Sequence, residues 1–193
     1  MAEADEKDQG IGNTIKKGLI GIIKGTGDVA DAVVDTVSGT LVNTVKSTHA
    51  VGAELGGLMV DSVRGAIQAA SDVGGDIGST AKGAVLGVLR GTKEVGGEAI
   101  DTVGTTVGAV VTSTAEVGGD LGSATKGAVE GAIAGAKDIG LSAEDAASAA
   151  ATGALKAAGA VSTTAVEQVR NALTGTISGV KVVIKEPFKS DEE

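Results

Sequence analysis

One phrase of the sequence returns almost unchanged after 44 residues. It reads "DVGGDIGSTAKGAVLGVLRG" at 72–91 and "EVGGDLGSATKGAVEGAIAG" at 116–135. Shorter offsets resolve this interval into two periods of 22 residues, and the register holds from about residue 18 to residue 183. A fixed period of this length is the signature of an array of like structural units. Any fold of this chain must therefore place equivalent side chains at equivalent points of successive units.

The spacing of apolar residues inside each unit predicts helix. Apolar side chains recur four residues apart, as at Val73, Ile77 and Ala81 or at Val85 and Leu89, whereas a half-buried strand alternates every two residues. Eleven residues make three helical turns at about 3.67 residues per turn, so a period of 22 keeps one face of a helix in phase. The alternative is a β-solenoid, because Val and Thr are abundant and favour strands.

On a helical wheel the aliphatic columns fill a single arc, with lysines just beyond one edge and acidic residues on the back. Such an amphipathic helix buries its apolar arc against another surface. We expect this arc to form the interface of the protein. Its predicted members are Ile23, Val29, Val45, Val51, Ile67, Val73, Val85, Leu89, Val95, Val111, Val117, Val129, Ile133, Ile139 and Leu155.

Glycine is the second unusual feature, with 32 of the 193 residues. Each interior glycine costs a helix about 1 kcal/mol relative to alanine, so a lone helix of this composition should be unstable in water. Two GxxxGxxxG runs lie beside the apolar arc, and small residues at this spacing let helix backbones approach closely. The predicted helix-packing glycines are Gly83, Gly87, Gly91, Gly127, Gly131 and Gly135.

The expected fold class is all-α, with long Gly-rich amphipathic helices built from 22-residue repeats of two 11-residue units. These helices could be extended or folded into a hairpin bundle. The Gly-Gly pairs at 74, 96 and 118 could be turns, but the apolar phase passes through them, which favours continuous helix. We expect a disordered acidic N-terminus at 1–12, helical repeats at 13–139, a further helical group at 140–185 capped at Ser142, and a tail at 186–193.

The sequence offers little for chemistry. There is no Cys, His49 is the sole histidine, Phe188 is the sole aromatic residue, and no base is placed to activate a Ser or Thr. We therefore expect a protein that is not an enzyme, with no catalytic residue, cofactor, metal or small-molecule substrate. Acidic pairs four residues apart could bind Ca²⁺ weakly or simply keep the outer face soluble, and we favour the second. These pairs are Asp72/Asp76, Glu94/Glu98 and Glu116/Asp120.

Charge and hydropathy restrict the partners. The net charge of −9 disfavours nucleic acid, whose binding draws on clustered Lys and Arg. The acidic N-terminus is unlike a signal peptide, and the longest uncharged run in the repeats, at 102–115, is too short to span a bilayer. We expect a cytoplasmic location, or one at the periphery of a membrane or inclusion.

The segment "GVLRGTKEVGGEAIDTVGTTVGAVV", residues 87–111, resembles a synuclein repeat region. Perilipins, apolipoproteins and group 3 late-embryogenesis-abundant proteins share the 11-residue period. The resemblance is one of pattern and covers most of the chain. It implies a chain that becomes helical on a lipid surface or on drying. The acidic repeats depart from it, and so does the apolar face, where Val, Ile and Ala dominate in place of Trp, Phe or Leu; these departures predict weaker attraction to anionic lipid and shallow insertion.

Three functions follow from these patterns. The leading one is association with lipid or another apolar interface, as a coat on a membrane, droplet or granule. The alternative is a self-assembling structural bundle or filament packed through glycine ridges, hence a homo-oligomer. The third is a stress protectant, against which the positive mean hydropathy argues. High helicity in plain buffer would favour assembly, and low helicity would favour folding induced by an interface.

Overall fold

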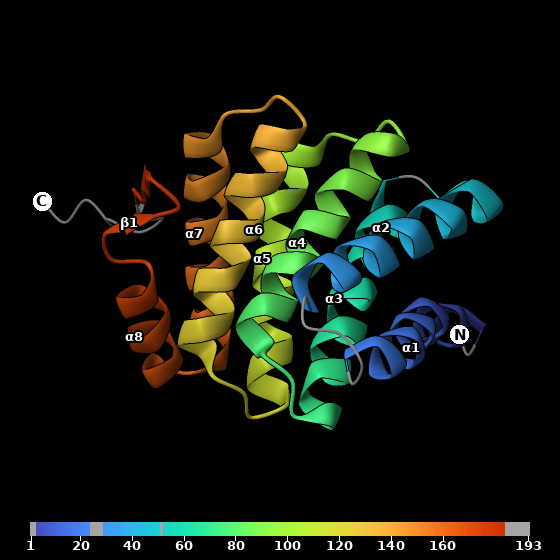
Figure 1. Ribbon diagram of the computed structural model, residues 1–193, viewed down its shortest axis with the longest axis horizontal. Coiled ribbons are helices and arrows are strands. Elements are labelled where there is room, and N and C mark those ends of the chain that lie inside the picture. Colours follow the sequence, from blue (N-terminus) through green and yellow to red (C-terminus); the bar gives the residue numbers. More distant parts are fainter. Residues whose placement is uncertain (1–2, 24–28, 51, 184–193) are drawn as a thin grey trace, which may run out of the picture.

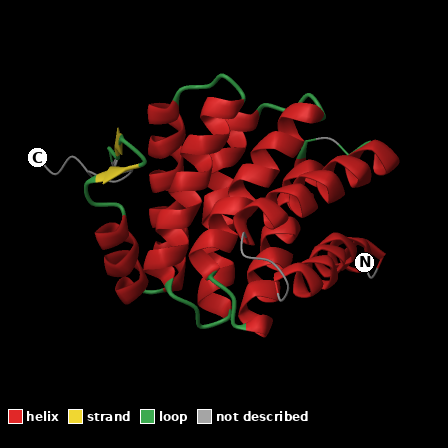
Figure 2. Cartoon of the chain, viewed as in Figure 1, coloured by secondary structure: helices red, strands yellow, loops and turns green. Residues whose placement is uncertain are grey.

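The computed structural model describes residues 3–23, 29–50 and 52–183, and there the chain forms helices joined by short connections (Figure 1). The helices are α1 (Glu3–Ile23), α2 (Val29–Thr48), α3 (Ala53–Val73), α4 (Ile77–Glu94), α5 (Ala99–Glu116), α6 (Leu121–Asp138), α7 (Ala143–Val161) and α8 (Thr163–Ala172). A short antiparallel hairpin of β1 (Thr176–Ile177) and β2 (Val180–Lys181) follows α8. The all-α class is confirmed (Figure 2).

The expectation that helix continues through the Gly-Gly pairs is wrong. Gly74, Gly96, Gly118 and Gly140 have φ angles of 67°, 78°, 67° and 74°, in the left-handed region that ends a helix. After each of them the next backbone N–H donates to a carbonyl five residues earlier, as from Gly97 to Thr92 at 2.9 Å. This is the Schellman motif, which satisfies the last carbonyls of a helix while the chain turns.

The apolar phase misled the prediction because a helix and a turn together fill one period. Each of α4, α5 and α6 has 18 residues, and the turns at 95–98 and 117–120 supply the remaining four of each 22. Helices of equal length joined by turns of equal length repeat the same apolar positions every 22 residues, even though the helix is interrupted at each turn. Phase alone therefore could not distinguish one long helix from a series of short ones.

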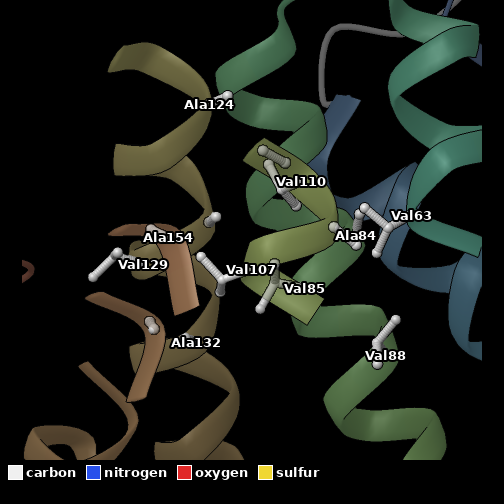
Figure 3. Close-up of a cluster of buried hydrophobic side chains, with 14 of the residues drawn as sticks. Val63, Ala84, Val85, Val88, Val107, Val110, Ala124, Val129, Ala132 and Ala154 are labelled. Carbon is white, nitrogen blue, oxygen red and sulfur yellow. The ribbon is translucent and has the colours of Figure 1, made fainter. Parts of the chain in front are cut away.

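The helices form two layers, and neighbours within a layer are two helices apart in the sequence. α2, α4 and α6 lie in one layer and α1, α3, α5 and α7 in the other, while α8 packs against α6 and α7 (Figure 1). The apolar core lies between the layers. Figure 3 shows part of it, with Val85 of α4, Val107 and Val110 of α5 and Val129 of α6 close together.

Both ends of the chain depart from the expected segments. α1 begins at Glu3, so residues 3–12 are helical where composition predicted disorder. Their helix continues into Ile11, Ile15 and Leu19, which are buried in the core and hold α1 in place. The segment 140–185 is not helical throughout, because the hairpin replaces helix after Ala172. The predicted tail at 186–193 lies outside the described residues.

Candidate interaction surface

The predicted apolar face is covered within the chain itself. Six of its members are buried, and they are Ile67, Val85, Leu89, Val111, Val129 and Ile133. Eight are half-buried, and they are Ile23, Val29, Val45, Val73, Val95, Val117, Ile139 and Leu155. Val51 lies outside the described residues. In this structure the six buried members therefore lie in the core, and their contact with any other surface would require the layers to separate.

The six predicted glycines lie where helices of one layer touch. A Cβ on Gly83 would stand 2.4 Å from the Ala30 carbonyl oxygen of α2, and one on Gly131 would stand 2.4 Å from the Lys82 oxygen of α4. Gly87 meets the Val34 oxygen of α2 and Gly127 meets the Gly78 oxygen of α4 in the same way, whereas a Cβ on Gly91 or Gly135 would meet a leucine side chain. Contacts below 3.0 Å to backbone leave no room for any side chain, so Gly83, Gly87, Gly127 and Gly131 set the distance between helices.

Two further glycine contacts were missed by the sequence analysis. A Cβ on Gly65 of α3 would stand 2.2 Å from the Gly12 oxygen of α1, and one on Gly153 of α7 would stand 2.1 Å from the Gly104 oxygen of α5. Neither glycine belongs to a GxxxGxxxG run. The signal that could have found them is the 22-residue period, because Gly65 lies 22 residues before Gly87 and Gly153 lies 22 residues after Gly131.

Ion pairs also join helices of the same layer at the surface. They are Lys16–Asp72, Lys46–Glu94, Arg64–Glu116, Lys82–Glu130 and Arg90–Asp138. Their side chains are partly exposed, so each contributes little free energy, roughly 0 to 1 kcal/mol.

Five of the six acidic residues predicted in pairs four apart have structural roles at the turns, whereas Glu98, at the N-cap of α5, makes no side-chain capping bond. Asp72, Glu94 and Glu116 stand at helix C-terminal ends and pair with a basic residue two helices earlier. Asp76 and Asp120 stand on the other side of the turn and cap the N-termini of α4 and α6. Among the described residues no three or more His, Cys, Asp or Glu side chains gather as metal ligands would.

The two capping aspartates have lowered pKa values. The backbone N–H of Ser79 donates to Asp76 at 3.1 Å and its hydroxyl donates at 2.9 Å, and these bonds lower the pKa of Asp76 from its ordinary 3.8. Ser123 makes the equivalent two bonds to Asp120, whose pKa is lowered for the same reason. Bonds of this kind favour the ionised carboxylate and fix the first turn of each helix.

We expect the ionised carboxylates of Asp76 and Asp120 to make the free energy of unfolding depend on pH in the acidic range. A folded-state pKa below the unfolded value contributes stability that is present above the unfolded pKa of about 3.8. That contribution is lost as the pH falls through the lowered folded-state pKa. The double variant Asp76→Asn/Asp120→Asn keeps a capping oxygen but cannot titrate. Its free energy of unfolding, measured by urea denaturation across acidic pH, should fall less steeply than that of the native chain.

The matched control is Asp35→Asn, which removes an exposed aspartate from the middle of α2. This variant should keep the native slope of stability against pH. A double variant with the native slope would contradict the role assigned to the two caps.

A groove of about 800 Å³ runs along the outer side of α5 and α7. Small residues form much of its lining, and the others are Ile100, two threonines, Ser148, Asp145 and Lys156. The full lining is Ile100, Gly104, Thr105, Gly108, Asp145, Ser148, Ala149, Thr152, Gly153, Lys156, Ala157 and Ala160. The groove is shallow and open, with one acidic and one basic side chain, and it is unlike a closed pocket for a small molecule.

His49 is exposed just after α2, and several threonine hydroxyls, such as those of Thr80 and Thr106, donate to carbonyl oxygens one helical turn earlier. No described helix is long and apolar enough to cross a membrane. The prominent features of the described residues are thus the close glycine contacts between helices, the ion pairs at the surface and the α5–α7 groove.

The comparisons with known proteins give no family for the chain. No protein-family model matches its sequence, and no curated protein matches it either. The functional argument therefore depends on the contacts, burial and charges described above.

Proposed function

We propose that this protein is a non-enzymatic structural protein, a helical bundle packed through glycine ridges that works by associating with other copies of itself. Its most constrained positions are packing positions. Backbone atoms at Gly78, Gly104 and Gly12 lie where a Cβ on the facing glycine would be 2.0 to 2.2 Å from oxygen. Closely packed helices with an open groove on the outside are compatible with a structural protein that associates through its helix faces.

The observation that carries the proposal is that the apolar arc and the glycine ridges are satisfied inside one chain. Leu141, Val161 and Val183 are the exposed large hydrophobic residues of the described chain, at 37%, 40% and 56% exposure. A body with so little apolar surface has no need of lipid to hold its shape. It can present fixed helix faces to a partner, which an induced helix could not do.

Circular dichroism in plain buffer tests the part of this proposal that separates it from association with lipid, namely that the chain folds without an added surface. We expect strong helix without any additive and a cooperative thermal transition, because the interlayer core already supplies the contact that single helices lack. Adding anionic or neutral phospholipid vesicles should change the helix signal little. Low helicity in buffer that rises sharply with vesicles would contradict the proposal and favour the lipid function.

Association with lipid or another apolar interface is the second candidate. It is favoured by the composition of the core, which consists largely of Ala and Val with few large side chains. Such a core buries less apolar area per residue than one rich in Leu and Phe, so opening it costs less. On this hypothesis the layers would separate at an interface and the buried arc would face lipid.

A further inference from the structure

We infer that α7 and the α5–α7 groove form the contact face of a two-fold symmetric dimer, whose other half is a second copy of this chain. This inference rests on the proposed function and makes its partner specific. In the dimer the two α7 helices lie antiparallel, and each one lies in the groove of the other subunit. Such an interface is isologous, so the same residues serve on both sides.

The first support is the shape of the face. The residues of α7 that line the groove follow one helical stripe, at positions 145, 148, 149, 152, 153, 156, 157 and 160. The middle of the stripe is Ser148, Ala149, Thr152 and Gly153, all small. Small side chains on both partners let helix axes approach to about 8 Å. This is the same kind of packing that joins α5 to α7 within the chain.

The second support is charge complementarity. Asp145 begins the stripe and Lys156 lies one turn before its other end, 11 residues or about three turns further on, which is about 16 Å along the axis. An antiparallel second α7 centred between residues 150 and 151 places each Asp145 opposite the partner's Lys156. The same centre brings Ser148 opposite the partner's Gly153 and Ala149 opposite the partner's Thr152. A parallel arrangement in register would instead set like charges together.

Neither charged group has a competing ionic partner in the part of the chain that the structure describes. No ion pair there includes Asp145 or Lys156, although five pairs join helices within the layers. Both residues are exposed. Two opposite charges at a fixed spacing on one helix, without an ionic partner among the described residues, are complementary to a second copy of the same helix that runs in the opposite direction.

The third support is the position of exposed apolar side chains. Leu141 precedes the N-terminal cap of α7 and Val161 is its last residue, and they are 37% and 40% exposed. In the antiparallel arrangement Leu141 comes beside the partner's Ala160, and Val161 comes beside the partner's Gly140. Two of the three exposed large hydrophobic residues in the described part of the chain would thus be covered at the two ends of one interface.

A charge-reversal experiment tests the inference with the full-length chain. Sedimentation equilibrium of the native protein at micromolar concentration should give a dimer. Asp145→Lys and Lys156→Glu should each be mostly monomeric, because each creates two like-charged contacts per dimer. We expect each to weaken dimerisation roughly tenfold or more. An equimolar mixture of the two variants should dimerise again, since every charge then faces its opposite.

The control variant is Lys126→Glu, which reverses an exposed charge on α6 in the other layer and should leave the dimer intact. Circular dichroism of each variant checks that the helices remain. A native protein that is helical and monomeric overturns the inference, as does a mixture that stays monomeric. An oligomer insensitive to both reversals also overturns it, while leaving self-assembly, and thus the proposed function, in place.

Discussion

Gly127→Ala is expected to destabilise the protein by about 3 kcal/mol, although it adds a single methyl group to a helix. The Cβ would stand 2.0 Å from the carbonyl oxygen of Gly78 and 2.8 Å from its carbonyl carbon. Both are backbone atoms of α4, so no side chain can rotate away. Relief requires α4 and α6 to separate along their contact, which opens space in the core beside them.

The control is the same substitution in the same kind of backbone with free space around it. Gly39 lies in α2 with no atom within 4 Å of the added Cβ. Gly39→Ala should stabilise the chain by about 0.5 to 1 kcal/mol, because alanine favours helix over glycine. Chemical denaturation of the two variants measures both effects. A neutral or stabilising Gly127→Ala would show that α4 and α6 do not touch as described.

Leu89→Ala is expected to cost about 3 kcal/mol, because it empties one of the few large side-chain volumes in a core of Ala and Val. Leu89 is 1% exposed, and its Cδ1 would lie 2.6 Å from a Cβ on Gly135 of α6. Gly135→Ala alone should also destabilise, since the methyl group would collide with the leucine. In the double variant the new methyl group enters space that Leu89 has left. The losses of stability of the two single variants should therefore add up to about 1 kcal/mol more than the loss measured for the double variant.

The coupling can be separated from a general loss of stability by a second pair. Leu89→Ala combined with Gly127→Ala joins the same cavity to a clash against the Gly78 backbone, which does not involve Leu89. These two costs should add. If the Leu89 and Gly135 costs were also simply additive in urea denaturation, the close contact between the two residues would be refuted.

The period and the glycine ridges predicted the helical class and placed the interface residues on one side. They could not decide which surface that side meets. A contact between Gly131 and Lys82 joins residues 49 positions apart, so it depends on how many helices lie between them. The same ridge could equally well meet another chain. Only the positions of the turns settle this, and the turns were the feature that the apolar phase concealed.

A local signal for the turns was nevertheless present. Gly118 is followed two residues later by Asp120, and Gly140 by Ser142, which places a residue suited to a left-handed helix end just before a good N-terminal cap. Read as a stop followed by a start, this pattern predicts a turn. The α5–α7 groove had no such signal, because Asp145 and Lys156 become a complementary pair only once α7 is known to be exposed on that side.

The layered contacts also bear on how long such a chain can be. The substantial contacts of each helix reach no further than two helices along the sequence. The packing of any one helix therefore does not depend on the total number of helices. Quasi-one-dimensional proteins of this kind gain or lose whole units without redesign of the rest. A gene encoding this architecture could therefore be lengthened by duplicating one helix pair with its two turns. The outermost helices alone would have to adapt to their place at the end of the stack.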